Sequence, residues 1–152
     1  MRILNLTQHI ATPAQVEAGV INVIPEHMGA LKVFLTFEEM PTPYDSVSAL
    51  SVSERVNALI TLIRRKEYLT IDAVMIGGAP WLMAPLQNAI HEVSLNVVYA
   101  YSERVSNETM DPDTGIVHKT NVFEHVGFVE AEGNADLSEW IDPPYGAYRD
   151  EH

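Results

Sequence analysis

The sequence predicts a three-layer α/β sandwich with a mainly parallel sheet and an antiparallel hairpin near its C-terminal end. Short apolar strands alternate with amphipathic helical segments, which is the pattern of parallel strands joined by helical crossovers. A turn signal, Asp-Pro-Asp-Thr-Gly at 111–115, separates two extended segments. The 152 residues, 47% of them apolar, are enough for one domain with its own hydrophobic core.

The first part of the chain predicts a strand followed by two helices. Residues 2–8 form a short apolar run that ends in polar side chains, as a buried strand does. Thr12 begins a capping-box-like helix start, and Gly19 can close that helix. A second helix begins at Pro25; its end is left open, because residues 32–37 also fit an extended segment.

The middle of the chain predicts helix, strand and helix in turn. Ser51 and Glu54 form a capping pair ahead of apolar residues at helical spacing. Residues 72–76 then form a short apolar strand that paired glycines stop. The next helix begins either at Pro80, with a bend further along, or at Pro85 after a long loop.

The last part predicts the hairpin and a tail. A strand over 95–101 extends through 102–110, and an alternating segment at 116–129 returns beside it. Residues 1–132 are therefore expected to form the domain, and 133–152 an acidic, partly disordered tail. Because a long hairpin edge needs covering, a homodimer is expected.

Composition excludes several classes of protein. The chain has no cysteine, so disulfides, thiolate metal sites and cysteine nucleophiles are ruled out. A formal net charge of −12 argues against a face that binds duplex nucleic acid, although it leaves room for a small anionic ligand. No apolar run is long enough to span a membrane, and cytoplasmic residence is expected. No metal-ligand spacing, Walker loop or dinucleotide fingerprint is present, so no metal or cofactor is expected.

Unusual residues follow the three predicted strands of the parallel region. In an open sheet of this Rossmann-like kind, the connections after parallel strands lie at one edge, where ligands bind. We therefore expect one ligand site to gather these groups. They are Thr7, Gln8 and His9 after the first strand, Gly77, Gly78, Ala79 and Trp81 after the second, and Ser102 and Arg104 after the third, with Lys119 on the returning strand.

Each group has a chemical use at such a site. Paired glycines let a ligand approach the backbone amides, and the following helix adds partial positive charge. Arg104 can hold a phosphate through two parallel hydrogen bonds, while His9 can transfer a proton near neutral pH. Trp81 could stack on a base. Structural roles compete with each of these: a tight turn for the glycines, packing in the core for Trp81, and an ion pair with Glu103 or Glu108 for Arg104.

Several stretches resemble a family of small uncharacterised bacterial α/β proteins: LNLTQH at 4–9, MIGGAPWLMAPL at 75–86, YAYSER at 99–104 and NVFEHVGFV at 121–129. More remotely, the layout is similar to CRISPR-associated Rossmann-fold (CARF) domains and ring nucleases, which bind cyclic oligoadenylate at a polar strand end and a Gly-Gly turn. The glycine turn also resembles nucleotide-recognising domains of the SLOG type. These resemblances imply a nucleotide ligand. Ala79-Pro80 depart from the pattern, because a basic or hydroxyl residue often follows the glycines.

Three hypotheses about function follow. In the first, the chain binds a small anionic nucleotide as a sensor, or cleaves cyclic oligoadenylate as a metal-independent ring nuclease, with His9 and Arg104 catalytic. In the second, it is a hydrolase or transferase that acts on a nucleoside or sugar phosphate. In the third, it is a non-enzymatic interaction module that uses the hairpin and the acidic tail.

Overall fold

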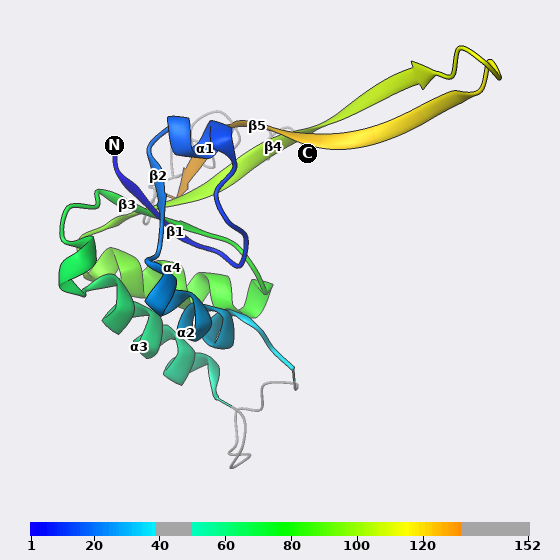
Figure 1. Ribbon diagram of the computed structural model, residues 1–152. Coiled ribbons are helices and arrows are strands. Elements are labelled where there is room, and N and C mark those ends of the chain that lie inside the picture. The colour runs from blue at the N-terminus through cyan, green and yellow to red at the C-terminus, as the bar shows by residue number, and fades with distance from the viewer. Residues whose placement is uncertain (39–49, 132–152) are drawn as a thin grey trace, which may run out of the picture.

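The computed structural model describes residues 1–38 and 50–131, and the predicted acidic tail lies outside them. Five strands form one sheet in the order β2-β1-β3-β4-β5 (Figure 1). β1 to β4 run parallel, and β5 returns antiparallel to β4. The predicted fold class is confirmed. The elements are β1 (Ile3–Leu6), α1 (Pro13–Glu17), β2 (Val20–Asn22), α2 (Pro25–Leu35), α3 (Val52–Ile63), a 3-10 turn η1 (Lys66–Tyr68), β3 (Ala73–Ile76), α4 (Pro80–Glu92), β4 (Asn96–Met110) and β5 (Val117–Ala131).

The two faces of the sheet are covered unequally. α2, α3 and α4 lie along one face, and the short α1 lies on the other (Figure 1). The larger core joins β1, β3 and β4 to the three long helices through residues such as Leu6, Leu59 and Leu82. A smaller cluster that includes Ile3 and Met75 packs on the α1 side. Within the described ranges, no helix has the length and apolar character that a membrane span requires.

Three local features differ from the sequence-based expectation or decide between its alternatives. β2, only three residues long, was not predicted, because so short a segment carries no measurable period. α4 begins at Pro80 and contains Pro85 in its interior, which selects the first of the two predicted starts. α2 continues through Leu35, so the alternative of an extended 32–37 segment is wrong.

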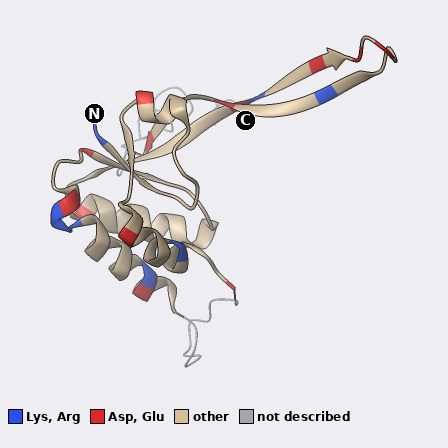
Figure 2. Ribbon diagram, in the orientation of Figure 1, with Lys and Arg blue, Asp and Glu red and all other residues tan. Residues whose placement is uncertain are grey.

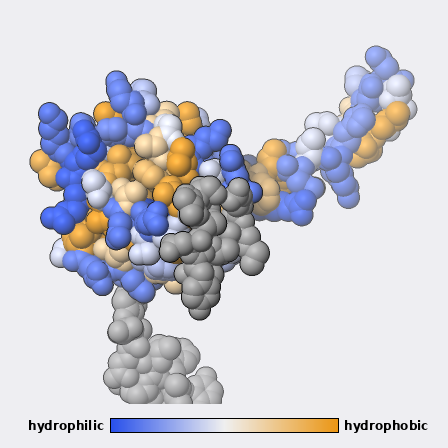
Figure 3. Space-filling model, turned by 90° about the horizontal axis from the view of Figure 1, so that it is seen from below, coloured by the Kyte–Doolittle hydropathy of each residue, from blue (hydrophilic) through white to orange (hydrophobic). Residues whose placement is uncertain are grey.

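The hairpin is longer and more isolated than the sheet itself requires. Only Asn96–Val98 of β4 pair with β3, whereas β4 and β5 pair from Val97↔Ala131 to Met110↔Val117. Beyond the part of β4 that pairs with β3, residues 101–127 form a two-stranded arm, which projects away from the domain (Figure 1). The arm carries charges of both signs (Figure 2), and apolar side chains are exposed along it (Figure 3). A register shift between Tyr101 and Ser102 marks the point where the arm leaves the sheet.

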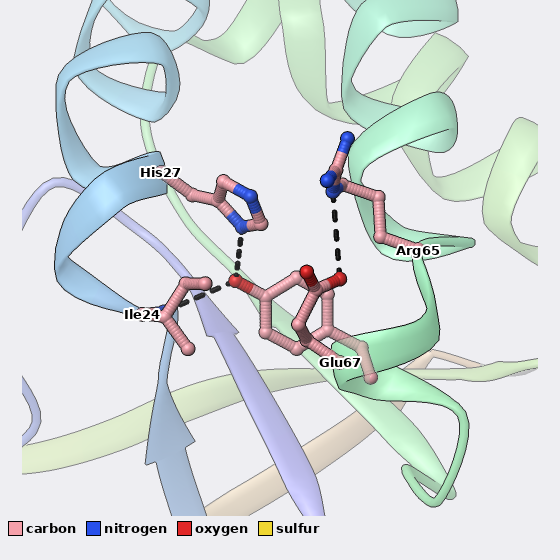
Figure 4. A network of polar contacts seen from close by, with 5 residues as sticks. Ile24, His27, Arg65 and Glu67 are labelled. Carbon is pink, nitrogen blue, oxygen red and sulfur yellow. Dashed lines mark hydrogen bonds and ion pairs between the residues drawn. The ribbon is translucent and has the colours of Figure 1, made fainter.

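A buried phenol connects the start of α2 to the turn after α3 (Figure 4). The Tyr68 hydroxyl accepts a hydrogen bond from the Ile24 amide at 3.1 Å and lies 2.7 Å from His27 Nδ1. Burial raises the pKa of Tyr68, so the hydroxyl stays protonated at neutral pH. In the same turn, Arg65 Nε lies 3.4 Å from Glu67 Oε2. This cluster fixes the position at which the chain passes from β2 into α2.

We expect Tyr68→Phe to lower the free energy of unfolding by about 1–3 kcal/mol, because a part-buried amide and an imidazole nitrogen would lose their partner. Urea unfolding followed by circular dichroism measures this. Tyr101→Phe is the control, since Tyr101 is half exposed on the arm and should change stability by less than about 0.5 kcal/mol. Equal effects of the two substitutions would contradict a structural role for the Tyr68 hydroxyl.

Candidate site at the ends of β1 and β3

The strand order creates a crevice between the C-terminal ends of β1 and β3. From β1 the chain continues to β2 on one side, and from β3 to β4 on the other, so the two connections diverge. Ligands of open α/β sheets bind at such a switch point. A pocket of about 330 Å³ lies there. Its lining includes five of the predicted residues, Thr7, Gln8, His9, Gly77 and Gly78, together with Ile10, Thr12, Gln15 and Met75.

The two strand ends are close enough to form one surface. A Cβ atom built on Gly77 would lie 3.6 Å from Thr7 Cγ2. Gly78 has a φ of +145°, which side chains of L-residues rarely adopt, so the turn into α4 depends on this glycine. α4 has no side-chain cap at Ala79. Among the described residues, no group accepts a hydrogen bond from the Gly78 or Ala79 amide. Gly78 lines the pocket, whereas the predicted residue Ala79 lines neither this pocket nor the one toward α2.

A buried asparagine holds the loop after β1 in shape. Asn5 is 3% exposed, and its Nδ2 donates to the His9 carbonyl at 2.7 Å and to Asn22 Oδ1 at 2.9 Å. Its Oδ1 accepts from the Thr7 amide at 3.0 Å and the Thr7 hydroxyl at 2.7 Å. All four hydrogen-bonding positions of the side chain are therefore used. Asn22 Oδ1 also accepts from the Ala11 amide at 3.0 Å, which ties the end of the same loop to β2.

A second pocket of about 220 Å³ lies on the other side of this loop, toward α2. Thr7, Gln8 and His9 line it too, so the loop forms a partition between the two pockets. Of the described residues that line this pocket, Lys32 of α2 is the only lysine or arginine. The sequence reasoning missed Asn5, Asn22 and Lys32. An asparagine inside an apolar strand was a usable signal for Asn5, whereas nothing distinguishes Lys32 from other helix-surface lysines.

The third predicted group does not join the crevice. The predicted extension of this strand through Met110 is confirmed, and because β5 runs beside it, Ser102 and Arg104 do not lie at a strand end as the site prediction assumed. Met75 pairs with Val98, so Arg104 lies four residues beyond the level of Gly77. At ~3.3 Å per residue this is about 13 Å along the arm. Ser102, Arg104 and Lys119 therefore lie on the arm and line neither of the two pockets.

Lys119 on the arm and Trp81 on α4 contact other side chains instead of lining a pocket. Lys119 Nζ lies 3.4 Å from Glu108 Oε1. Glu108, which was one of two predicted ion-pair partners of Arg104, therefore pairs with Lys119 instead. Trp81, 52% exposed, packs edge-to-face against Phe37 with ring centroids 5.4 Å apart, away from both pockets. His9 lines both pockets with an exposed side chain and is the one imidazole in either lining.

The described residues that line the two pockets offer hydrogen-bond donors and a positive charge. Among the described residues that line the two pockets there is no aspartate or glutamate. What the linings offer instead is an ammonium group, an imidazole, amide and hydroxyl side chains, and backbone amides. Such donors suit phosphate or carboxylate oxygens, which would be repelled by carboxylates.

Comparison with known proteins gives a family but no named function. No curated protein and no solved structure matches the chain. The model of one family, described as the uncharacterized protein MJ1673 family, matches residues 1–129, which include both pockets and most of the arm. The chain belongs to the MJ1673 family of uncharacterised proteins.

Proposed function

We propose that this protein binds a small phosphate-bearing ligand of the nucleotide class in the crevice between β1 and β3. The observation that carries the proposal is that the described residues of both pocket linings include no carboxylate, in a chain with a formal net charge of −12. A small anion meets its most favourable surroundings where donors gather and acids are missing. The position at the switch point of a parallel sheet supports the same site.

The geometry suggests how such a ligand would be held. The phosphate lies against the backbone of Gly77 and Gly78, which line the pocket just before the uncapped start of α4. The rest of the ligand passes the loop at 7–10, with His9 and Thr7 beside it. Beyond the loop, the smaller pocket supplies Lys32 for a second anionic group, together with apolar contacts from Met28 and Leu31. A ligand with more than one phosphate fits this distribution of donors.

Cyclic oligoadenylate is one such ligand, and the CARF and ring-nuclease resemblance names it. A cleavage reaction would need a group that moves a proton, for which His9 is suited. It would also use cations that stabilise charge on the phosphate, and the predicted one, Arg104, lies on the arm. Binding is therefore the part of the hypothesis that the crevice supports, and a role as a nucleotide sensor follows from it without turnover.

A ligand panel tests the proposal. The full chain is mixed with adenosine, AMP, linear and cyclic oligoadenylates, a sugar phosphate and inorganic phosphate, and its thermal unfolding is followed. We expect phosphorylated ligands to raise the midpoint and adenosine to leave it unchanged. A ligand at 100 times its Kd stabilises by about 2.7 kcal/mol, which is an easily measured shift. Chromatography of the same mixtures detects any cleavage. No shift with any phosphorylated compound would overturn the proposal.

We expect Gly77→Ala to weaken binding of whichever ligand the panel identifies by at least about tenfold, because the new methyl group fills space between the strand ends. Its contact with Thr7 Cγ2, at 3.6 Å, is an ordinary one, so the fold should tolerate it. Gly29→Ala is the matched control, since nothing lies within 4 Å of that position on α2. Calorimetric titration of both variants measures the difference, and unchanged affinity in Gly77→Ala would place the ligand elsewhere.

A further inference from the structure

Within residues 1–38 and 50–131, no strand pairs with the outer edge of β5 along the arm. β5 is the last strand of the sheet, and its register partners in the described part of the chain all belong to β4. Apolar side chains stay exposed near it, with Phe123 at 75% and Val117 at 55% (Figure 3). A two-stranded ribbon without further packing is only marginally stable in water, and a long free edge is a template for another strand. We therefore expect another strand to pair with the outer edge of β5.

Charge restricts what that partner can be. Residues 101–127 contain five acidic residues and two basic ones, a net charge of −3. A nucleic acid or an anionic lipid surface would be repelled by such an arm, because both select clustered lysine and arginine. A protein strand remains, and since a second copy of the arm has the same net charge, its pairing must place basic groups opposite acidic ones.

One pair within the arm is unfavourable as it stands. Glu103 and Glu124 are direct register partners, so two carboxylates face each other across the ribbon. No basic side chain among the described residues lies within ion-pair distance of either of them. A basic group that approached Glu124 from the free edge would reduce this repulsion.

We infer that a second copy of this chain pairs antiparallel with the β5 edge, around a twofold axis at Asn121. In such a pairing, residues equally far before and after the axis lie opposite each other on the same face. His118 then lies opposite the partner's Glu124, and Lys119 opposite the partner's Phe123. Each contact occurs twice, and the two sheets become one.

The register follows from the sequence of β5. With the axis at Thr120, Glu124 would lie opposite Ile116, and with the axis at Val122, opposite Thr120. With the axis at Phe123, it would lie opposite Val122. Only the Asn121 axis gives Glu124 a basic neighbour, and it also places an ammonium group against an aromatic ring. An imidazole can donate a hydrogen bond to a carboxylate in either protonation state.

A single introduced thiol tests this arrangement directly, because the chain has no cysteine. Asn121→Cys places two thiols at the axis, where cross-strand Cβ atoms lie ~4.5–5.5 Å apart. Mild oxidation should convert most of the protein to a disulfide-linked dimer. Ser106→Cys is the matched control, because Ser106 is exposed and pairs with Asn121 from the β4 side. It should remain largely uncrosslinked.

A charge exchange supplies the second measurement. His118→Glu places a carboxylate opposite the partner's Glu124 at both symmetry-related contacts. Sedimentation should show a dimer dissociation constant at least about tenfold higher than that of the unmodified chain. Adding Glu124→Lys to it should restore the dimer. Circular dichroism checks that each variant stays folded. A monomeric unmodified chain, equal cross-linking of the two thiol variants, or a dimer indifferent to the charge exchange would each overturn the inference.

Discussion

Replacing Arg55 with methionine is expected to lower the free energy of unfolding by about 3 kcal/mol, one of the largest effects of any single polar substitution in this domain. Arg55 lies in the first turn of α3 and is 7% exposed. Its guanidinium stacks on the Phe37 ring, 4.1 Å from the centroid, and donates to four backbone carbonyls, those of Leu50, Val33, Phe34 and Thr36. The last three lie at the end of α2, where helical carbonyls lack partners.

Methionine keeps the length and packing of the arginine stem but leaves these carbonyls without a donor. Burial lowers the pKa of Arg55, yet the group remains charged at any pH at which the protein folds. The loss should therefore be independent of pH between about 5 and 9. Urea unfolding of Arg55→Met and of Arg64→Met, an exposed control at the end of the same helix, separates the bonding from the charge. Similar stabilities would show that the carbonyl contacts contribute little.

Local signals predicted the parts of the fold that depend on neighbouring residues. The Thr12–Gln15 capping box forms as expected, with both hydrogen bonds present, and the Glu54 amide donates to the Ser51 hydroxyl at 3.1 Å. The 111–115 turn forms with a hydrogen bond from the Gly115 amide to the Asp111 carbonyl. Each of these needs only a few consecutive residues, and the sequence contains all of them.

The extension of the 95–101 strand through Met110 was predicted, but Ser102 and Arg104 were wrongly grouped with the ends of the other two strands. Tyr101–Arg104 turn polar, and a polar run after an apolar one resembles the end of a strand. In the structure the polarity instead marks the point where β4 leaves the covered sheet and both of its faces become exposed. Residues 95–104 alone do not distinguish these cases, since the continuation depends on the pairing of β4 with β5, which begins at Val117.

The crevice likewise depends on contacts between residues that are far apart in the sequence. Thr7 and Gly77 are separated by 70 residues, and their meeting follows from strand order, which the sequence does not state. The glycine turn and the polar strand end were nevertheless visible, because each interrupts a buried strand. Lys32 could not be found, because it faces the site only through the path of α2.

Asn5→Leu is expected to affect stability and ligand binding together. Leucine has a similar size, but it would leave the Thr7 amide, the His9 carbonyl and Asn22 Oδ1 without their present partner. The free energy of unfolding should fall by about 2–4 kcal/mol, because buried groups lose several hydrogen bonds at once. The loop at 7–10 would also lose its anchor, and since it separates the two pockets, the position of the donors would no longer be fixed.

Affinity for the ligand identified in the panel should therefore drop by more than about tenfold, at temperatures where the variant is still folded. Asn96→Leu is the control, since Asn96 is an exposed strand residue and its substitution should change neither quantity appreciably. Calorimetric unfolding and titration of both variants provide the measurement. If Asn5→Leu were destabilised but bound the ligand normally, the loop would be a structural element of β1 and β2 only. The anion would then have to be held by the Gly77–Gly78 turn without the loop.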